Sequence, residues 1–177
     1  MLYAVLAVVL VVAIVLALAL RKPATFRVER RVVIDAPAAA AHARVEDFRR
    51  WAEWSPWEKL DPAMRRTHSG AAAGVGAVYE WSGTGKVGAG RMEIRESTPA
   101  RIVIQLDFIK PFEGHNIAEF DFAPEGARTA VRWAMHGPAP FISRLMQVFM
   151  NMDAMIGRDF EAGLANLKAA AEAAPAT

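Results

Sequence analysis

The spacing of hydrophobic residues divides the chain into three parts. Residues 2–20 are apolar without interruption and contain no charged, amide, proline or glycine residue. Between Phe26 and Met135, seven short segments alternate apolar and polar residues, which is the pattern of half-buried β-strands. From Ile142 to Leu167, apolar residues recur at steps of three and four. This spacing predicts one long amphipathic helix whose apolar stripe faces the sheet.

The alternating segments predict an antiparallel sheet. The turns between the last six segments are short and rich in glycine and proline, as hairpin connections require, whereas parallel strands would need long crossovers. Arg30 breaks the alternation of the first segment, and we interpret it as a strand-edge residue. The predicted strands are residues 26–35, 65–69, 76–82, 86–97, 102–108, 116–122 and 129–135.

Two short helices are predicted between the first strand and the rest of the sheet. Pro37 begins an alanine-rich helical stretch that extends to about Ala43, and residues 45–53 form the second helix. Inside the long C-terminal helix, Gly157 and Gly163 each cost about 1 kcal/mol relative to alanine. We expect this cost to be offset by a close approach of the helix to the sheet, or by room for a bound molecule.

Three of the five tryptophans lie within seven residues. Each carries a large aromatic surface and one N–H donor, so the cluster either plugs a core or lines a cavity for an apolar ligand. Trp51 and Trp54 are spaced to share one helical face and pack inward. Trp57, which follows Pro56, is expected at the rim of a cavity or at a membrane surface.

The N-terminal apolar run has the length of a membrane span. Its 19 residues would extend about 28 Å as a helix, close to the hydrocarbon thickness of a bilayer, and Arg21, Lys22 and Pro23 end it sharply. A cleaved signal peptide is an alternative, since residues 17–19 resemble a cleavage site. However, nothing basic precedes the run, and it exceeds the usual apolar region of a signal peptide. A buried helix of a soluble core is the third possibility.

Basic residues around this run predict its orientation. No lysine or arginine precedes it, whereas five follow closely, namely Arg21, Lys22, Arg27, Arg30 and Arg31. By the positive-inside rule, the C-terminal part then lies in the cytoplasm. The predicted organisation is a transmembrane anchor over residues 1–22, which contacts the lipid bilayer through Leu2 to Leu20, and one soluble domain over residues 23–177.

Composition and motifs argue against several chemistries. The net charge is +2 with signs mixed along the chain, so nucleic acid is not an expected partner. The absence of cysteine excludes disulfides, thiol nucleophiles and Cys-ligated zinc. Residues 83–88 match G-x-G-x-x-G, but a strand follows where a dinucleotide site needs a helix. The four histidines are scattered too widely for a metal site: His42, His68, His115 and His136. We therefore expect no cofactor and no metal.

Carboxylates on the predicted strands are candidates for acid–base chemistry only if they point inward. Strand alternation places Asp107, Glu119 and Asp121 on the outer face, and Glu80 is also expected there. An enzyme would need an inward acid or base with a perturbed pKa, such as Glu80, Glu93 or His115. No catalytic residue is assigned from the sequence.

Six segments together resemble a known superfamily, namely residues 32–37, 47–57, 74–81, 88–94, 129–133 and 159–164. They are similar to the START/Bet v 1-like (SRPBCC) superfamily, in particular its bacterial polyketide cyclase/dehydrase-like branch. The resemblance implies an α+β helix-grip fold, in which a curved antiparallel sheet wraps around a long C-terminal helix. It also implies that the anchor lies in the bacterial inner membrane. The superfamily includes lipid and hormone carriers, aromatic cyclases and chaperone activators, and has no shared catalytic residue.

The predicted concave face and the helix opposite it supply candidates for a ligand cavity, although the same residues would also suit a plain core. The candidates are Trp51, Trp54, Trp57, Tyr79, Trp81, Phe108, Phe120, Trp133, Met146, Phe149 and Met152. We expect a non-catalytic binder of a hydrophobic small molecule or lipid at the membrane. The alternatives are a module that binds a membrane protein partner and a cyclase- or dehydratase-like enzyme.

Overall fold

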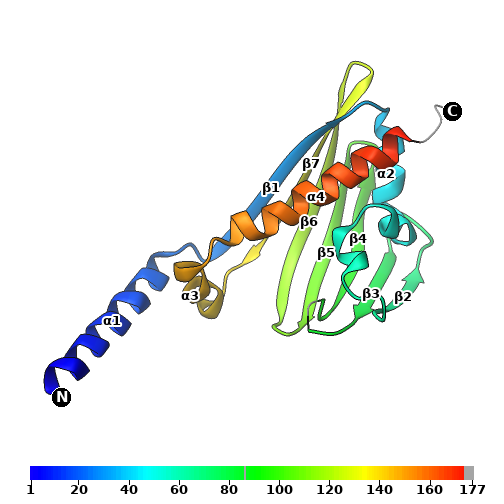
Figure 1. The fold of residues 1–177 in the computed structure, drawn as a ribbon. Helices are drawn as coiled ribbons and strands as arrows, with labels where there is room; N and C mark the ends of the chain where they lie inside the picture. The colour runs from blue at the N-terminus through cyan, green and yellow to red at the C-terminus, as the bar shows by residue number, and fades with distance from the viewer. Residues whose placement is uncertain (86, 174–177) are drawn as a thin grey trace.

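The computed structural model describes residues 1–85 and 87–173, which form a curved sheet, a long C-terminal helix and a separate N-terminal helix (Figure 1). The elements in chain order are α1 (Leu2–Arg21), β1 (Thr25–Ile34), α2 (Ala38–Val45), η1 (Phe48–Glu53), η2 (Pro56–Lys59), β2 (Arg65–Gly70), β3 (Ala77–Ser82), β4 (Ala89–Thr98), β5 (Arg101–Lys110), β6 (Gly114–Glu125), β7 (Arg128–Pro138), α3 (Phe141–Phe149) and α4 (Met152–Glu172). The helices η1 and η2 are 3-10 helices.

The seven strands form one sheet in the order β1-β7-β6-β5-β4-β3-β2, and all neighbours are antiparallel. Strands β2 to β7 follow one another as a meander because short turns connect them. The chain returns through α2, η1 and η2 between β1 and β2, which leaves β1 to pair with β7. The sheet curves around α4 (Figure 1). The predicted α+β helix-grip fold is confirmed.

Strand ends differ from the predicted ones by a few residues, and β6 and β7 are longer than expected. The expected start of β4 at Lys86 lies outside the described residues, and the strand is observed from Ala89. No helix follows the glycines at 83–88, so this segment is the connection between β3 and β4. The predicted helix over residues 45–53 is replaced by the end of α2 and by η1.

Strand alternation sorts the side chains onto two faces. The concave face carries the apolar core and packs against α4, η1 and α2; its largest buried side chains include Ile34, Ile94, Ile102, Ile104, Phe120 and Val131. The outer face carries the charges. Glu119, Asp121 and Asp107 all lie there with charged neighbours, as predicted, and Glu80 is exposed.

Glu119 is the most buried carboxylate of this outer face. Its Oε1 accepts a hydrogen bond from Arg101 Nη2 at 2.7 Å, and His136 Nε2 lies 3.3 Å away. Burial by itself would raise the pKa of the Glu119 carboxyl. The hydrogen bond from His136 and the charges of Arg101 and Arg27 outweigh burial, so the pKa lies below its usual value.

Glu119→Gln should make the protein less sensitive to acid. A carboxylate with a depressed folded pKa stabilises the fold above the unfolded pKa of about 4.3, and this contribution is lost as the pH falls through the folded value. At neutral pH the variant should be less stable by about 1 kcal/mol. Urea unfolding at about pH 5 and about pH 3 should show a smaller loss of stability for the variant than for the wild type. Equal losses would contradict this assignment.

The predicted single helix over residues 142–167 is wrong, because the chain breaks between α3 and α4. Met150 has extended backbone angles (φ −129°, ψ 138°), and Asn151 caps α4 by accepting a hydrogen bond from the N–H of Ala154 at 3.0 Å. The apolar spacing continues across the break and hides it. Asn151, followed by Asp153 in the first turn, is the start signal that the spacing obscured.

Two glycines allow α4 to lie close to the sheet, as expected. A Cβ at Gly157 would lie 1.9 Å from Nη2 of Arg30, and a Cβ at Gly163 would lie 2.8 Å from the ring of Trp133. Arg30 lies on the edge strand β1, as expected, and it also contacts α4. Its guanidinium donates hydrogen bonds to Asp153 and Glu161 of α4, which packs directly against β1. This contact ties the first turns of α4 to β1.

The N-terminal helix α1 projects away from the sheet (Figure 1). It is the one helix in the described chain that is long and apolar enough to cross a membrane, and it is almost entirely exposed. This exposure argues against a core helix of a soluble domain. The length and composition of α1 suit a membrane anchor and a signal sequence alike.

Candidate functional site

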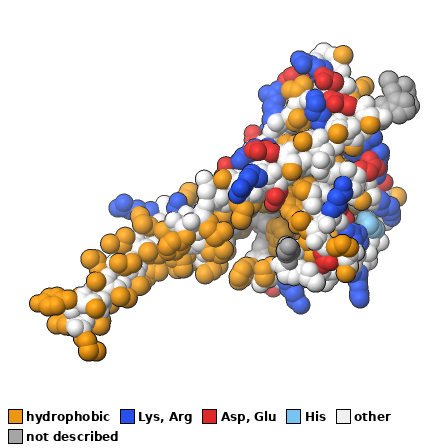
Figure 2. Space-filling view, viewed as in Figure 1, with side chains coloured by type: hydrophobic (Ala, Val, Ile, Leu, Met, Phe, Trp, Pro, Cys, Tyr) orange, Lys and Arg blue, Asp and Glu red, His pale blue; other side chains and the backbone are white. Residues whose placement is uncertain are grey.

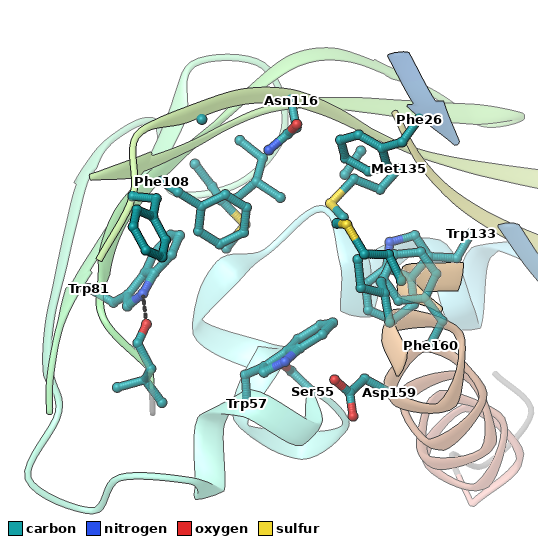
Figure 3. Close-up of a pocket in the computed structure, with 18 of the residues that line it drawn as sticks. Phe26, Ser55, Trp57, Trp81, Phe108, Asn116, Trp133, Met135, Asp159 and Phe160 are labelled. Carbon is teal, nitrogen blue, oxygen red and sulfur yellow. Dashed lines mark hydrogen bonds between the residues drawn. The ribbon is translucent and has the colours of Figure 1, made fainter. Parts of the chain in front are cut away.

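A cavity of about 400 Å³ lies between the concave face of the sheet, η2 and the first half of α4. Most of its wall is apolar, and Figure 3 shows aromatic rings from several elements around an open centre. The lining residues that remain exposed mark its mouth, namely Phe112, Glu113, Pro138, Pro140 and Asp159. The cavity is therefore open at the end of the sheet where β5 turns into β6 and β7 runs into α3.

The tryptophan cluster is divided between the core and the cavity. Asp47 caps η1 by accepting a hydrogen bond from the N–H of Arg49 at 2.9 Å. Trp51 Nε1 donates to the carbonyl of Val45 at 2.9 Å, and Trp54 Nε1 donates to the carbonyl of Arg44 at 3.1 Å. Both rings are almost fully buried, and these bonds satisfy their only polar group.

Trp57 lies on η2 and is only partly buried. Its ring meets Trp133 edge-on, with centroids 5.6 Å apart, and forms part of the cavity wall (Figure 3). Trp133 in turn stacks on Phe160 of α4, with centroids 4.0 Å apart and planes 5° from parallel. Phe120 stacks on Trp133 at 4.9 Å, away from the cavity. This aromatic stack forms one side wall and separates the cavity from the core.

One polar cluster borders the cavity beside Tyr79. The Tyr79 hydroxyl donates to Glu58 Oε1 at 2.5 Å, and Arg66 donates from Nε to Glu58 Oε2 at 2.6 Å. Arg66 Nη2 also donates to the carbonyl of Glu58 at 2.7 Å. Burial and the Glu58 carboxylate raise the pKa of Tyr79 well above its ordinary value, so the phenol stays protonated. Both carboxylate oxygens already accept hydrogen bonds, which disfavours a role for Glu58 as a general base.

Asn116 is a second polar group of the wall. Its side chain is buried, lies at the cavity wall opposite Trp57 (Figure 3), and offers both a donor and an acceptor. Gly137 makes room for it, since a Cβ there would lie 2.2 Å from Asn116 Oδ1. An apolar wall with a few fixed polar groups is typical of sites that bind and orient small molecules.

Seven of the eleven sequence-predicted residues line the cavity: Trp51, Trp57, Tyr79, Trp81, Phe108, Trp133 and Met152. Trp54 and Phe120 are buried behind the aromatic stack instead. Met146 and Phe149 do not face the sheet at all. They lie on α3, where their side chains are 42% and 71% exposed, because the break at Asn151 turns α3 away from the concave face.

The prediction missed several lining residues. Met92, Leu106 and Met135 lie on the concave face, and Ile156 and Phe160 lie on α4. Alternation and helical spacing would have been sufficient to find these five. Nothing local marks Glu58, whose partners Arg66 and Tyr79 lie 8 and 21 residues further along the chain.

The residues proposed for an enzyme do not reach the cavity. Glu93 pairs with Arg91 and Arg95, and His115 pairs with Asp107 on the outer face. Glu80 is exposed and lies outside the cavity wall. Among the described residues, no three His, Cys, Asp or Glu side chains gather closely enough to hold a metal ion. The enzymatic alternative therefore loses the residues on which it depended.

Residues 25–172 match the family model described as polyketide cyclase / dehydrase and lipid transport. The chain belongs to this family. The matched residues include the sheet, the cavity and α4, so the polyketide cyclase-like domain extends over all elements after α1. A search of curated proteins gave no match.

Solved structures share the fold of this polyketide cyclase-like domain at low sequence identity. A protein from Chromobacterium violaceum is 18% identical, with a TM-score of 0.58 over 86% of this chain and 100% of its own. An aromatase/cyclase from a Streptomyces species is 19% identical, with a TM-score of 0.60 over 84% and 94% of the two chains. The Aha1 dimer from Colwellia psychrerythraea is 15% identical, with a TM-score of 0.57 over 85% and 99%. At these identities the likeness shows the fold alone.

Proposed function

We propose that this protein binds a hydrophobic small molecule or lipid in the cavity, without catalysis, while α1 holds it at a membrane. The observation that carries the proposal is an open, largely apolar cavity of about 400 Å³ whose polar groups are engaged with one another or suited to orient a ligand. The family description includes lipid transport, which agrees with this role.

The wall of the cavity supports an apolar ligand of moderate size. Its volume is within the range of about 300 to 1,000 Å³ that small-molecule sites occupy. Each apolar group transferred from water into such a wall contributes about 25 cal/mol per Å² of buried surface. Met92, Met135 and Met152 line the wall, and methionine adapts its shape to different ligands. Asn116 can hydrogen-bond a single polar group on the ligand.

The location at the membrane rests on α1 and on the residues that follow it. Within the described chain, α1 packs mainly against α3, and the rest of its apolar surface is exposed. A bilayer would cover this surface. The excess of basic residues just after α1 favours a cytoplasmic location of the domain, as in a single-pass protein of the inner membrane. The proposed division is an anchor over residues 1–22 and a binding domain over residues 23–177.

Native mass spectrometry of the detergent-extracted full-length protein should show a bound apolar molecule that dissociates on collisional activation. The bound fraction should be at least tenfold lower for Ala118→Phe, which places a ring in the cavity. Equal retention by both proteins would contradict binding in this cavity. The same spectra report whether residues 1–22 remain on the chain, because a cleaved signal sequence would lower the mass of the mature protein.

A further inference from the structure

Helix α3 packs against α1, but it keeps an apolar surface that remains exposed in the described chain. Five of its side chains, counting the residue that follows it, are at least 40% exposed: Phe141, Ile142, Met146, Phe149 and Met150. The helix contains no acidic residue, and its one charged side chain, Arg144, lies over the ring of Phe141 at 5.8 Å. An exposed cluster of this kind marks a site of interaction with a membrane or a partner.

A second exposed apolar surface lies at the end of β5 and in the turn between β5 and β6. Ile109 is 52% exposed and Phe112 is 67% exposed. Phe112 also lines the mouth of the cavity, as do Pro140 and Ser143 at the start of α3. The two apolar surfaces therefore border the same opening from two sides.

The apolar surface of α3 is continuous with that of α1. The two helices pack against each other, and the only residues of α1 that are not exposed are Val15 and Ala19, one turn apart. At about 1.5 Å per residue, these positions lie about 9 Å and 3 Å before Arg21 along the helix axis. Figure 2 shows hydrophobic side chains that cover α1 and continue over α3 toward the hollow beside α4.

This depth favours a bilayer as the occupant of the surface. If Arg21 and Lys22 lie among the headgroups, then α3 lies at the boundary of headgroups and acyl chains, where amphipathic helices bind with their apolar face about 5 to 10 Å deep. Arg144 and Lys110 lie beside the two apolar surfaces and suit anionic headgroups. Glu113 and Asp159 are the carboxylates at the mouth, and Asp153 is paired with Arg30.

We propose that α3 and the β5–β6 turn insert into the surface of the same bilayer that holds α1, so that the cavity opens directly onto lipid. An apolar ligand then passes between bilayer and cavity without crossing water. The proposal rests on the membrane-anchored binding function above and adds the entry route and the surface that forms it.

The absence of cysteine makes a direct test possible with single-cysteine variants of the full-length chain. Phe149→Cys, Phe112→Cys, Leu10→Cys and Ala127→Cys would each carry an environment-sensitive fluorophore. All four positions are exposed, and Ala127 lies in the β6–β7 turn at the opposite end of the sheet (Figure 1). The proteins are reconstituted into vesicles of equal parts phosphatidylcholine and phosphatidylglycerol, with and without nitroxide-labelled lipid.

Nitroxide lipid should quench the labels at residues 149 and 112, and the label at residue 127 should keep its fluorescence. The label at residue 10 reports on the anchor alone. If residue 10 is quenched and residues 149 and 112 are not, the entry route is wrong while the anchor stands. If residue 10 is not quenched, the membrane-anchored function itself fails. A shift of the residue 149 emission without quenching would show that protein, such as a second copy of this chain, covers α3, and would also overturn the proposal.

Discussion

Ala118→Phe should weaken ligand binding strongly and leave the fold intact. Ala118 is in the middle of β6, where Ile104 of β5 and Met135 of β7 are its register partners. It lines the cavity, so a larger side chain points into open space rather than into packed core. The added ring takes the place of the ligand, and the apolar surface that the ligand would bury is then already covered by protein.

The loss of affinity should be at least tenfold, which corresponds to about 1.4 kcal/mol or more. Titration with a fluorescent fatty acid or phospholipid, in parallel with thermal unfolding, measures both properties. Gln105→Phe is the matched control, because it adds the same ring to the outer face of the neighbouring strand β5. Normal binding by Ala118→Phe, or equal losses in the two variants, would argue against a ligand in this cavity.

Trp54→Ala should destabilise the protein by about 3 to 5 kcal/mol. The ring is 1% exposed and meets Trp51, Phe120 and Trp133, with centroids 4.8 to 5.9 Å apart. Its removal leaves a void among rings that are held in place by several elements, so little collapse can fill it. The carbonyl of Arg44 also loses its hydrogen bond. A loss of this size is a large part of the stability of an ordinary domain, about 5 to 15 kcal/mol.

Trp57→Ala is the contrasting variant, because this ring faces the cavity instead of the core. It should cost about 1 to 2 kcal/mol, since the wall beside it is already open, and it should change ligand affinity more than stability. Near-UV circular dichroism during urea unfolding would measure the stability of both variants, and titration with the same fluorescent lipid would measure their ligand affinity. If Trp57→Ala unfolds as readily as Trp54→Ala, then Trp57 belongs to the core and the division of the cluster is wrong.

Hydrophobic spacing was sufficient to predict the architecture of this protein. Strand alternation and helical repeats report which face of each element is buried, and that property is encoded within a few residues of each position. The seven strands, the inward Trp51 and Trp54, and the outward Asp107 and Glu119 all follow from it. The break at Asn151 did not, because an apolar stripe can continue in phase across two separate helices.

The break shows why the site was predicted only in part. Met146 and Phe149 have the spacing of cavity residues, but α3 leaves the concave face and presents them on the outside. Of the apolar α4 residues that do reach the cavity, Met152 was predicted as a cavity residue, whereas Ile156 and Phe160 were predicted only as members of the apolar stripe. Spacing identifies which side chains avoid water but does not identify what covers them.

The sequence alone determined the order of the strands, the inner and outer faces of the sheet and the apolar character of the N-terminal run, because each of these depends on local patterns of residue type. Only the tertiary structure decided which rings form the core and which border an open cavity, since that depends on contacts between residues far apart in the chain. The Glu58 carboxylate between Arg66 and Tyr79 and the Trp133–Phe160 stack are such contacts. The packing of α3 on α1 beside the cavity mouth is another, and it leads from a binding domain to a proposed route for its ligand.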